Sequence, residues 1–276
     1  MKYLSTINMS SNELKKQLKF LSIKVGCKQN IEVEKWGTGF FVELDLDQKT
    51  ELFFITAKQN IHNKSLDFVY PKMVWELNTI NLKNREINDE PRQFDIDLTK
   101  QRIYINEDFI VFHCTSFIDQ INNELFKNNE VLYFLVVNYL NLLPNPKVIK
   151  NTVDLLDLNL FTPIYLVGYL THNYEIRTTN LVIKKSEISS EIDSKIDDND
   201  LFLVDSGLTK LSYGSLVIKF NNGDGRLNHI ILGILVDFET IEVNINDKYI
   251  ELPNGYCRIL SIYKIIDYIF NVVLIN

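Results

Sequence analysis

Apolar and polar residues alternate along much of the chain, with the two-residue period of half-buried β-strands. Residues 31–36 and 240–252 show this alternation, and short apolar runs at 40–44 and 52–57 are also typical of strands. Between two further apolar runs, 216–218 and 230–236, the chain reads Asn221-Asn222-Gly223-Asp224-Gly225. Asn, Asp and Gly tolerate the positive φ of tight turns. The pattern therefore predicts a mostly β chain with a hairpin that turns near residue 223.

Helical spacing of apolar residues marks a few segments near the ends and the middle of the chain. Leu14, Leu18 and Leu21 share one helical face after the capping box Ser10-Ser11-Asn12-Glu13. The stretch 261–270 repeats isoleucine at helical intervals. Residues 117–142 contain the spacing of a helix followed by a strand. We expect a short helix at each end and a linking helix between two β units.

The best candidate for a domain boundary is Pro144-Asn145-Pro146, because proline stops regular structure and stiffens a crossing. The boundary divides the 276 residues into three parts: an N-terminal helix in 1–24, a first β unit in 25–145, and a second β unit with a C-terminal helix in 146–276.

Composition narrows the classes of function. Apolar residues make up 46% of the chain, which is enough for a sizeable core, and the net charge of −7 does not favour nucleic-acid binding. The longest apolar run, 131–143, is interrupted by Asn138 and Asn141 and is too short to cross a bilayer. Because residues 1–11 lack the apolar centre of a signal peptide, we expect a cytoplasmic protein with no membrane contact.

No motif in the sequence indicates a cofactor or a metal. The three cysteines lie far apart and form no C-x-x-C pair, and the four histidines show no metal-ligand spacing. Gly223-Asp224-Gly225 lacks the Lys-Ser/Thr and the following helix of a phosphate loop. We expect neither a metal nor a cofactor.

Four short motifs follow one another along residues 25–270: Gly37-Thr38-Gly39-Phe40 with Thr56-Ala57-Lys58-Gln59, then Asp108-Phe109-Ile110-Val111, then Val167-Gly168-Tyr169, then Tyr213-Gly214-Ser215-Leu216-Val217. In their order and separation they resemble the trypsin-like (chymotrypsin-fold) serine peptidases. The resemblance implies a mostly β protein of two six-stranded-type antiparallel β-barrels, with a short N-terminal helix and a C-terminal helix.

The same resemblance implies a degenerate catalytic site. Gln59 stands at the position of the histidine, Tyr213 at that of the nucleophilic serine, and Asp108 at that of the orienting aspartate. A side-chain amide does not accept a proton near neutral pH, and a phenol with a pKa of about 10 stays protonated without a base. Leu211 replaces a glycine that helps to present an oxyanion N–H. The substitutions predict an inactive protease homologue, or pseudoprotease.

The favoured hypothesis is a protein- or peptide-binding scaffold subunit, of a kind that the resemblance places in bacterial defence or signalling assemblies. Its cleft would be lined by Gln59, Asp108, Leu211, Tyr213, Gly214 and Ser215. Extended peptides add to strand edges through main-chain hydrogen bonds, which need no catalytic triad. The sequence also offers the N-terminal helix and the acidic loop 186–199 as docking elements, and leaves the oligomeric state open.

Two alternatives remain. A divergent active serine peptidase would use Ser215 or Ser212 as nucleophile, with His62 as base and Asp108 behind it. Since His62 lies one helical turn beyond residue 59, the base would move by about 5 Å from the family position. In the other alternative, Tyr213 is only an aromatic residue of a hairpin and Gln59 only a surface residue.

Overall fold

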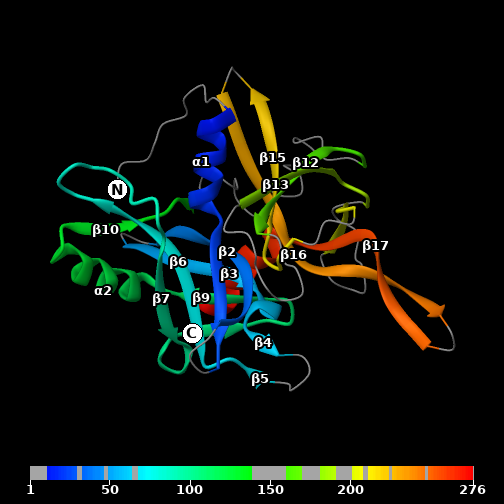
Figure 1. Cartoon of the computed structure of the whole chain (residues 1–276), viewed down its shortest axis with the longest axis horizontal. Helices are drawn as coiled ribbons and strands as arrows, with labels where there is room; N and C mark the ends of the chain where they lie inside the picture. The colour runs from blue at the N-terminus through cyan, green and yellow to red at the C-terminus, as the bar shows by residue number, and fades with distance from the viewer. Residues whose placement is uncertain are drawn as a thin grey trace.

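The computed structural model describes residues 11–29, 33–46, 49–63, 68–138, 160–169, 181–190, 201–207, 211–223, 226–245 and 248–275. Within them, two antiparallel sheets curl toward each other, and short helices lie at their margins (Figure 1). No helix among these residues is long and apolar enough to cross a membrane. The capping residue Ser10, the Pro144–Pro146 boundary, the turn residues 224–225 and the loop residues 191–199 lie outside the described residues.

The first sheet holds nine strands within the described residues, in the order β10-β6-β1-β2-β3-β9-β8, with β7 paired to β6 and β11 parallel to β2. Its strands are β1 (Ile23–Lys28), β2 (Val33–Leu46), β3 (Lys49–Ala57), β6 (Lys72–Asn81), β7 (Arg92–Asp97), β8 (Ile103–Ile105), β9 (Phe109–His113), β10 (Glu130–Tyr133) and β11 (Val136–Asn138). A small separate ladder joins β4 (His62–Asn63) to β5 (Phe68–Val69).

The second sheet has the order β13-β12-β15-β16-β17-β14. Its strands are β12 (Pro163–Tyr169), β13 (Leu181–Glu187), β14 (Leu201–Asp205), β15 (Leu216–Gly223), β16 (Arg226–Ile245) and β17 (Lys248–Ser261). The predicted hairpin is the β15–β16 pair, in which Gly223 faces Arg226. The prediction of two antiparallel barrels is confirmed, and the first of the two sheets is larger than the six-stranded type expected.

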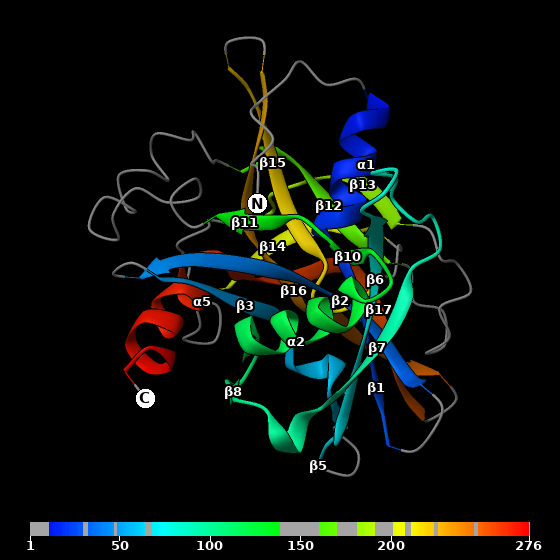
Figure 2. The same cartoon turned by 90° about the vertical axis from the view of Figure 1, so that its left-hand side faces the viewer.

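The α-helices described are α1 (Ser11–Leu21), α2 (Thr115–Phe126) and α5 (Ile262–Tyr268). Two 3-10 turns, η1 (Lys58–Asn60) and η2 (Leu98–Lys100), follow strands of the first sheet, and the π-helical turn η3 (Ile269–Val273) follows α5. The helices expected at the two ends and in the middle are therefore present. Figure 2 shows α2 alongside β10, and α5 at the C-terminal end of the chain. Ser261 caps α5, since its hydroxyl accepts a hydrogen bond from the N–H of Tyr263.

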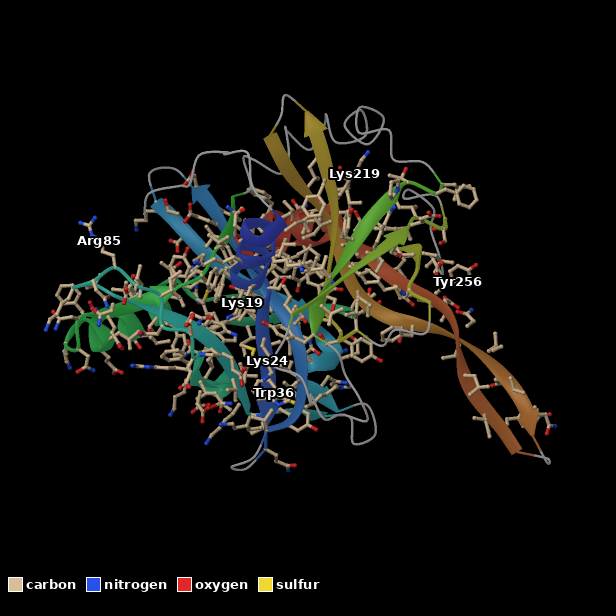
Figure 3. The ribbon with its side chains drawn as sticks, turned by 45° about the horizontal axis from the view of Figure 1, so that its top comes forward. Lys19, Lys24, Trp36, Arg85, Lys219 and Tyr256 are labelled. Atoms are coloured by element: carbon tan, nitrogen blue, oxygen red, sulfur yellow. The ribbon has the colours of Figure 1, made fainter. Side chains whose placement is uncertain are left out.

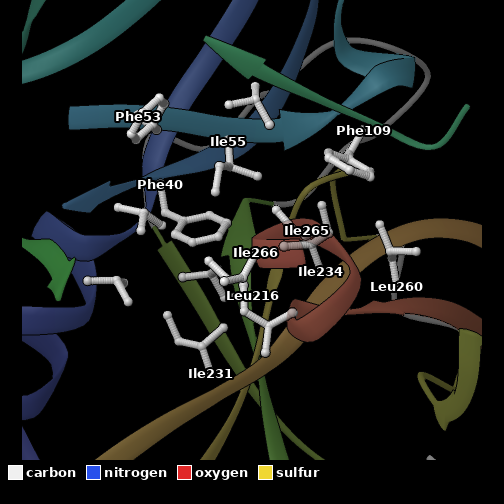
Figure 4. Close-up of a cluster of buried hydrophobic side chains, with 14 of the residues drawn as sticks. Phe40, Phe53, Ile55, Phe109, Leu216, Ile231, Ile234, Leu260, Ile265 and Ile266 are labelled. Carbon is white, nitrogen blue, oxygen red and sulfur yellow. The ribbon is translucent and has the colours of Figure 1, made fainter. Parts of the chain in front are cut away.

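The main hydrophobic core lies between the two sheets, and both sheets contribute side chains to it. Phe40, Phe53 and Phe109 of the first sheet face Leu216 and Ile231 of the second, and α5 adds Ile265 and Ile266 (Figure 4). Successive side chains of a strand point to opposite faces. Phe40 therefore enters this core, while its neighbour Phe41 enters a second core around the fully buried Trp75. The unbroken apolar run at residues 40–42 reflects a strand that is buried on both faces.

Candidate functional site

Gln59 and Asp108 come together because β3 pairs with β9. The register sets Ala57 opposite Phe109, so the turn η1 begins where β9 begins. The N–H of Lys58 donates to the carbonyl oxygen of Asp108 at 2.9 Å. Two of the three positions that the sequence indicated are thus neighbours at one end of the first sheet.

The third position, Tyr213, lies at the corner of a tight turn that precedes β15. The N–H of Ser215 donates to the carbonyl of Ser212 at 3.2 Å, and Gly214 has φ +79°, as the third residue of a type II turn requires. A Cβ at Gly214 would collide with the carbonyl oxygen of Thr38. Glycine is needed here both for its φ and for the close approach of the first sheet.

The turn is fastened to the first sheet by hydrogen bonds that converge on the carbonyl oxygen of Tyr213. It accepts from the N–H of Thr38 and from Nδ2 of Asn60, each at 2.9 Å. Nδ2 of Asn60 also lies 2.8 Å from Oγ1 of Thr56, and Oγ1 of Thr38 lies 2.5 Å from Oγ of Ser212. We call Thr38, Thr56, Asn60, Ser212 and Tyr213 the polar junction. It brings the segments that hold residues 59, 108 and 213 to one place.

Thr38 and Asn60 were not anticipated as members of this site. The signal available was the sequence Gly37-Thr38-Gly39, whose first glycine leaves room for the Asn60 side chain. A Cβ at Gly37 would overlap that amide. Thr38 and Asn60 therefore join the two sheets from beside the positions that the sequence indicated, and both bind the backbone carbonyl of Tyr213.

Three buried oxygen atoms at the site have no hydrogen-bond partner among the described residues: Oε1 of Gln59, Oδ1 of Asn60 and Oδ2 of Asp108. Burial is the main cause that raises the pKa of Asp108. The positive charges of Lys264 and Lys58 act against the shift, and Glu107 and Asp237 add to it.

The phenol ring of Tyr213 is half-buried and packs against the second sheet. Its centroid lies 5.7 Å from that of Phe238 in an edge-to-face arrangement, and Nζ of Lys35 lies 5.8 Å from the ring. Tyr213 thus spans both sheets, with its carbonyl bound to the first and its ring packed on the second. Tyr213 as an aromatic residue that only packs beside a hairpin, and Tyr213 as the replacement of a nucleophile, both stay predictions.

The remaining residues that the sequence indicated lie in the interior or beyond the site. Ser212 and Ser215 are fully buried, and Oγ of Ser215 donates to the carbonyl of Ser212 at 2.6 Å. Leu211 is buried in the core of the second sheet. His62 lies past η1 in β4, opposite Val69. The binding roles of Leu211 and Ser215 stay predictions.

The described cavities lie elsewhere. The larger, of about 430 Å³, lies between α1, β1 and β6 of one half and Tyr169 and Leu181 of the other. Lys24 and Glu76 line it and form an ion pair at 2.9 Å. Tyr169 connects the cavity to the site, because its hydroxyl donates to the carbonyl of Ser22 while its own carbonyl accepts from the N–H of Ser212.

Comparison with solved structures finds a serine protease and an inactivated protease paralogue among the similar folds. The Drosophila Grass clip serine protease of the Toll pathway matches with a TM-score of 0.52 at 8% identity, over 94% of this chain and 70% of that one. The scabies mite inactivated protease paralogue S-I1 matches with a TM-score of 0.51 at 10% identity, over 95% of this chain and 99% of that one. No protein-family model and no curated protein sequence matches the chain. The fold is that of the trypsin-like serine proteases.

Proposed function

We propose that this chain, a trypsin-fold protein, does not cleave peptides and acts as a protein- or peptide-binding subunit. The observation that carries the proposal is the use of the polar junction. At the corner where an attacking hydroxyl would be needed, Tyr213 spans the two sheets through its carbonyl and its ring. The neighbouring hydroxyls of Ser212 and Ser215 are buried and already hydrogen-bonded.

The chemistry of the site supports the same conclusion. Acyl transfer from a peptide needs a nucleophile that loses its proton to a nearby base. Gln59 supplies an amide in place of that base, and its Oε1 is buried. The Asp108 carboxyl, with its raised pKa, has no imidazole in contact to orient. Loss of the base alone removes a contribution of about 10²–10⁴ in rate.

The scabies mite neighbour supports the proposal by example, because a protein described as inactivated keeps the same fold over nearly all of its length. Peptide binding uses parts of this fold that take no part in catalysis. Strand edges and surface loops can hold an extended segment through main-chain hydrogen bonds after catalytic groups are lost. A role in a larger assembly is part of the proposal, with the assembly left unspecified.

The test exposes the full-length chain to a fluorophosphonate probe, which reacts with activated serines. Active trypsin is the positive control, and Ser212→Ala and Ser215→Ala are the matched variants. We expect no labelling of the chain. Labelling that disappears in one of the two variants would overturn the proposal in favour of a peptidase with His62 as base.

A second measurement addresses binding directly. The chain is incubated with a library of extended peptides, and the mixture is followed by mass spectrometry. We expect some peptides to be retained by the chain with their length unchanged. Shortened peptides that the Ser212→Ala or Ser215→Ala variant fails to produce would contradict the proposal.

A further inference from the structure

The most unusual surface of the molecule is the far end of the β16–β17 hairpin. Figures 1 and 3 show it leaving the body of the protein as a long two-stranded projection. We call the pair of segments Thr240–Ile245 and Lys248–Pro253 the arm. Its register pairs Thr240 with Pro253 at the base and Ile245 with Lys248 at the far end.

The arm has both edges open within the described residues. β15 covers the other edge of β16 only as far as Ile234, and β14 covers the other edge of β17 only from Tyr256 onward. A two-stranded hairpin is marginally stable in water by itself, and an open edge is a template for a further strand. β16 contains no proline, whereas β17 contains Pro253, which has no N–H to donate. The edge of β16 is therefore the better one for strand addition.

One face of the arm is apolar and exposed. Ile241 lies opposite Leu252, and Val243 lies opposite Ile250. Ile241 is 50% exposed, Ile250 42% and Leu252 41%. Four apolar residues in adjacent cross-strand pairs, far from either core, form an unusual surface for a soluble protein.

The charge of the arm indicates what covers it. Within the arm, Glu242 lies opposite Glu251 on the neighbouring strand, and Lys248 is the only basic residue of the two segments. Glu242 alternates with Ile241 and Val243, so it lies on the opposite face, where it is exposed. A second copy of the chain would bring an equally acidic arm, and like charges on facing strands repel. Charge complementarity favours a basic partner.

We propose that the arm is a docking site for an extended segment of another protein that alternates apolar and Lys/Arg side chains. The segment adds to the edge of β16 as a third strand. Its apolar side chains extend the face of Ile241 and Val243, and its basic side chains approach Glu242 on the other face. The arm is separate from the polar junction, so this proposal stands whether or not the chain cleaves peptides.

The test uses a fluorescent, end-capped eight-residue peptide of alternating lysine and valine, with a glutamate–valine peptide as its counterpart. Binding to the full chain is followed by fluorescence anisotropy and by hydrogen exchange of the β16 amides. We expect the lysine peptide alone to bind, more weakly at high salt, and to protect amides within residues 239–245.

Matched variants locate the binding. Glu242→Lys should weaken binding about tenfold, because an attractive cross-strand contact with the lysine peptide is lost and a repulsive one replaces it. Glu124→Lys makes the same charge change at an exposed position of α2 and should alter binding less than twofold. A chain shortened by joining Thr240 to Pro253 through Asn-Gly should not bind. If that chain fails to fold, the two glutamate variants decide the question.

Several outcomes would overturn the proposal. Equal binding by the Glu242→Lys and Glu124→Lys chains would mean that the lysine peptide responds only to overall acidity. If the glutamate peptide bound as tightly as the lysine peptide, the arm would have no preference for a basic partner, and the proposal would be wrong. A wild-type dimer in sedimentation velocity that Glu242→Lys leaves intact and Ile241→Lys dissolves would make a second copy the occupant. Labelling by the fluorophosphonate probe would bear on the proposed function alone.

Discussion

The polar junction and the arm are opposite extremes of one fold, the first a buried contact between the two sheets and the second an exposed projection. At the junction, backbone and side-chain groups of both sheets meet in a buried space. The hydroxyls of Thr38 and Ser212 are hydrogen-bonded, and so are the carbonyls of Thr38, Ser212 and Tyr213. In the arm, β16 continues well beyond the body, and its apolar residues face solvent. The junction joins the two sheets, whereas the arm leaves both of its edges open within the described residues.

Contacts that hold a protease fold together can be distinguished from the groups that its chemistry needs. The segment that carries a nucleophile in the family is also a segment that joins the two sheets of this chain, through the backbone carbonyl of Tyr213. Side chains at its corner can change as long as the carbonyl of Tyr213 stays bound to Asn60 and Thr38. The five predictions below test this contrast.

The largest change we expect is chemical. The double variant Gln59→His with Tyr213→Ser places an imidazole and a hydroxyl at the two substituted positions, beside Asp108. We expect fluorophosphonate labelling at residue 213, about a hundredfold or more above that of Gln59→Ala with Tyr213→Ser, which has the serine without the base. A folded double variant that is not labelled would show that the three positions do not correspond to a catalytic triad.

Gly214→Ala should be the most destabilising single substitution at the junction. It places a side chain at φ +79° and against the carbonyl oxygen of Thr38, so we expect the free energy of unfolding to fall by about 3 kcal/mol or more. Gly255→Ala is the control. Gly255 has φ +97°, but its added Cβ would have its nearest neighbour 3.8 Å away. It should lose about 1 kcal/mol in denaturant unfolding. Equal losses would mean that the close approach is unimportant.

Asn60→Ala removes the amide that joins Thr38, Thr56 and Tyr213. The two N–H groups of this amide are shared among the three acceptors, and the carbonyls of Thr38 and Tyr213 each keep another donor, so we expect a loss of about 2 kcal/mol. Asn123→Ala, at an exposed position of α2, should change stability by less than about 0.5 kcal/mol. Urea unfolding of both variants measures the difference. A small effect at Asn60 would mean that the backbone hydrogen bond between Thr38 and Tyr213 contributes most of the stability of the junction.

Asp108→Asn tests the electrostatics of the site. Burial raises the pKa of Asp108 in the folded state, so the folded chain binds more protons than the unfolded chain between the two pKa values. Stability therefore falls as pH rises through that window, and the charged carboxylate is unfavourable at pH 7. We expect Asp108→Asn to gain a few tenths of a kcal/mol at pH 7, since the half-exposed group is screened by solvent, and to gain nothing below the window. Asp119→Asn on α2 is the control for a general charge effect.

Much of the fold follows from local pattern. The β15–β16 hairpin was predicted from apolar runs on either side of Asn222-Gly223, and α1 and α5 were predicted from helical spacing. These elements depend on neighbours in sequence, so a single sequence reveals them. The convergence of the segments at 59, 108 and 213 was also predicted, through the order of four motifs that resemble one family.

Other features depend on contacts between residues far apart in the chain, and no local sequence pattern indicates them. In the sequence, Asn60 is one more polar residue after Gln59. Its role becomes visible only in the fold, where its side chain binds the carbonyl of Tyr213. Ser215 and Leu211 were taken as cleft residues from their place beside Tyr213, but both side chains are buried. The alternation in 240–252 correctly predicted strands. It could not reveal that they leave the body, because that depends on where β14 and β15 stop.

The smallest expected effect lies in the arm and compares two isoleucines of one strand. Ile234 is fully buried in the main core, whereas Ile241, seven residues later in β16, is half exposed. Ile234→Ala should lower the free energy of unfolding by about 3 kcal/mol, and Ile241→Ala by less than about 0.5 kcal/mol. Urea unfolding of the isolated chain measures both. A large loss at Ile241 would mean that the arm is already covered by this chain, which would remove the reason for a partner strand at its edge.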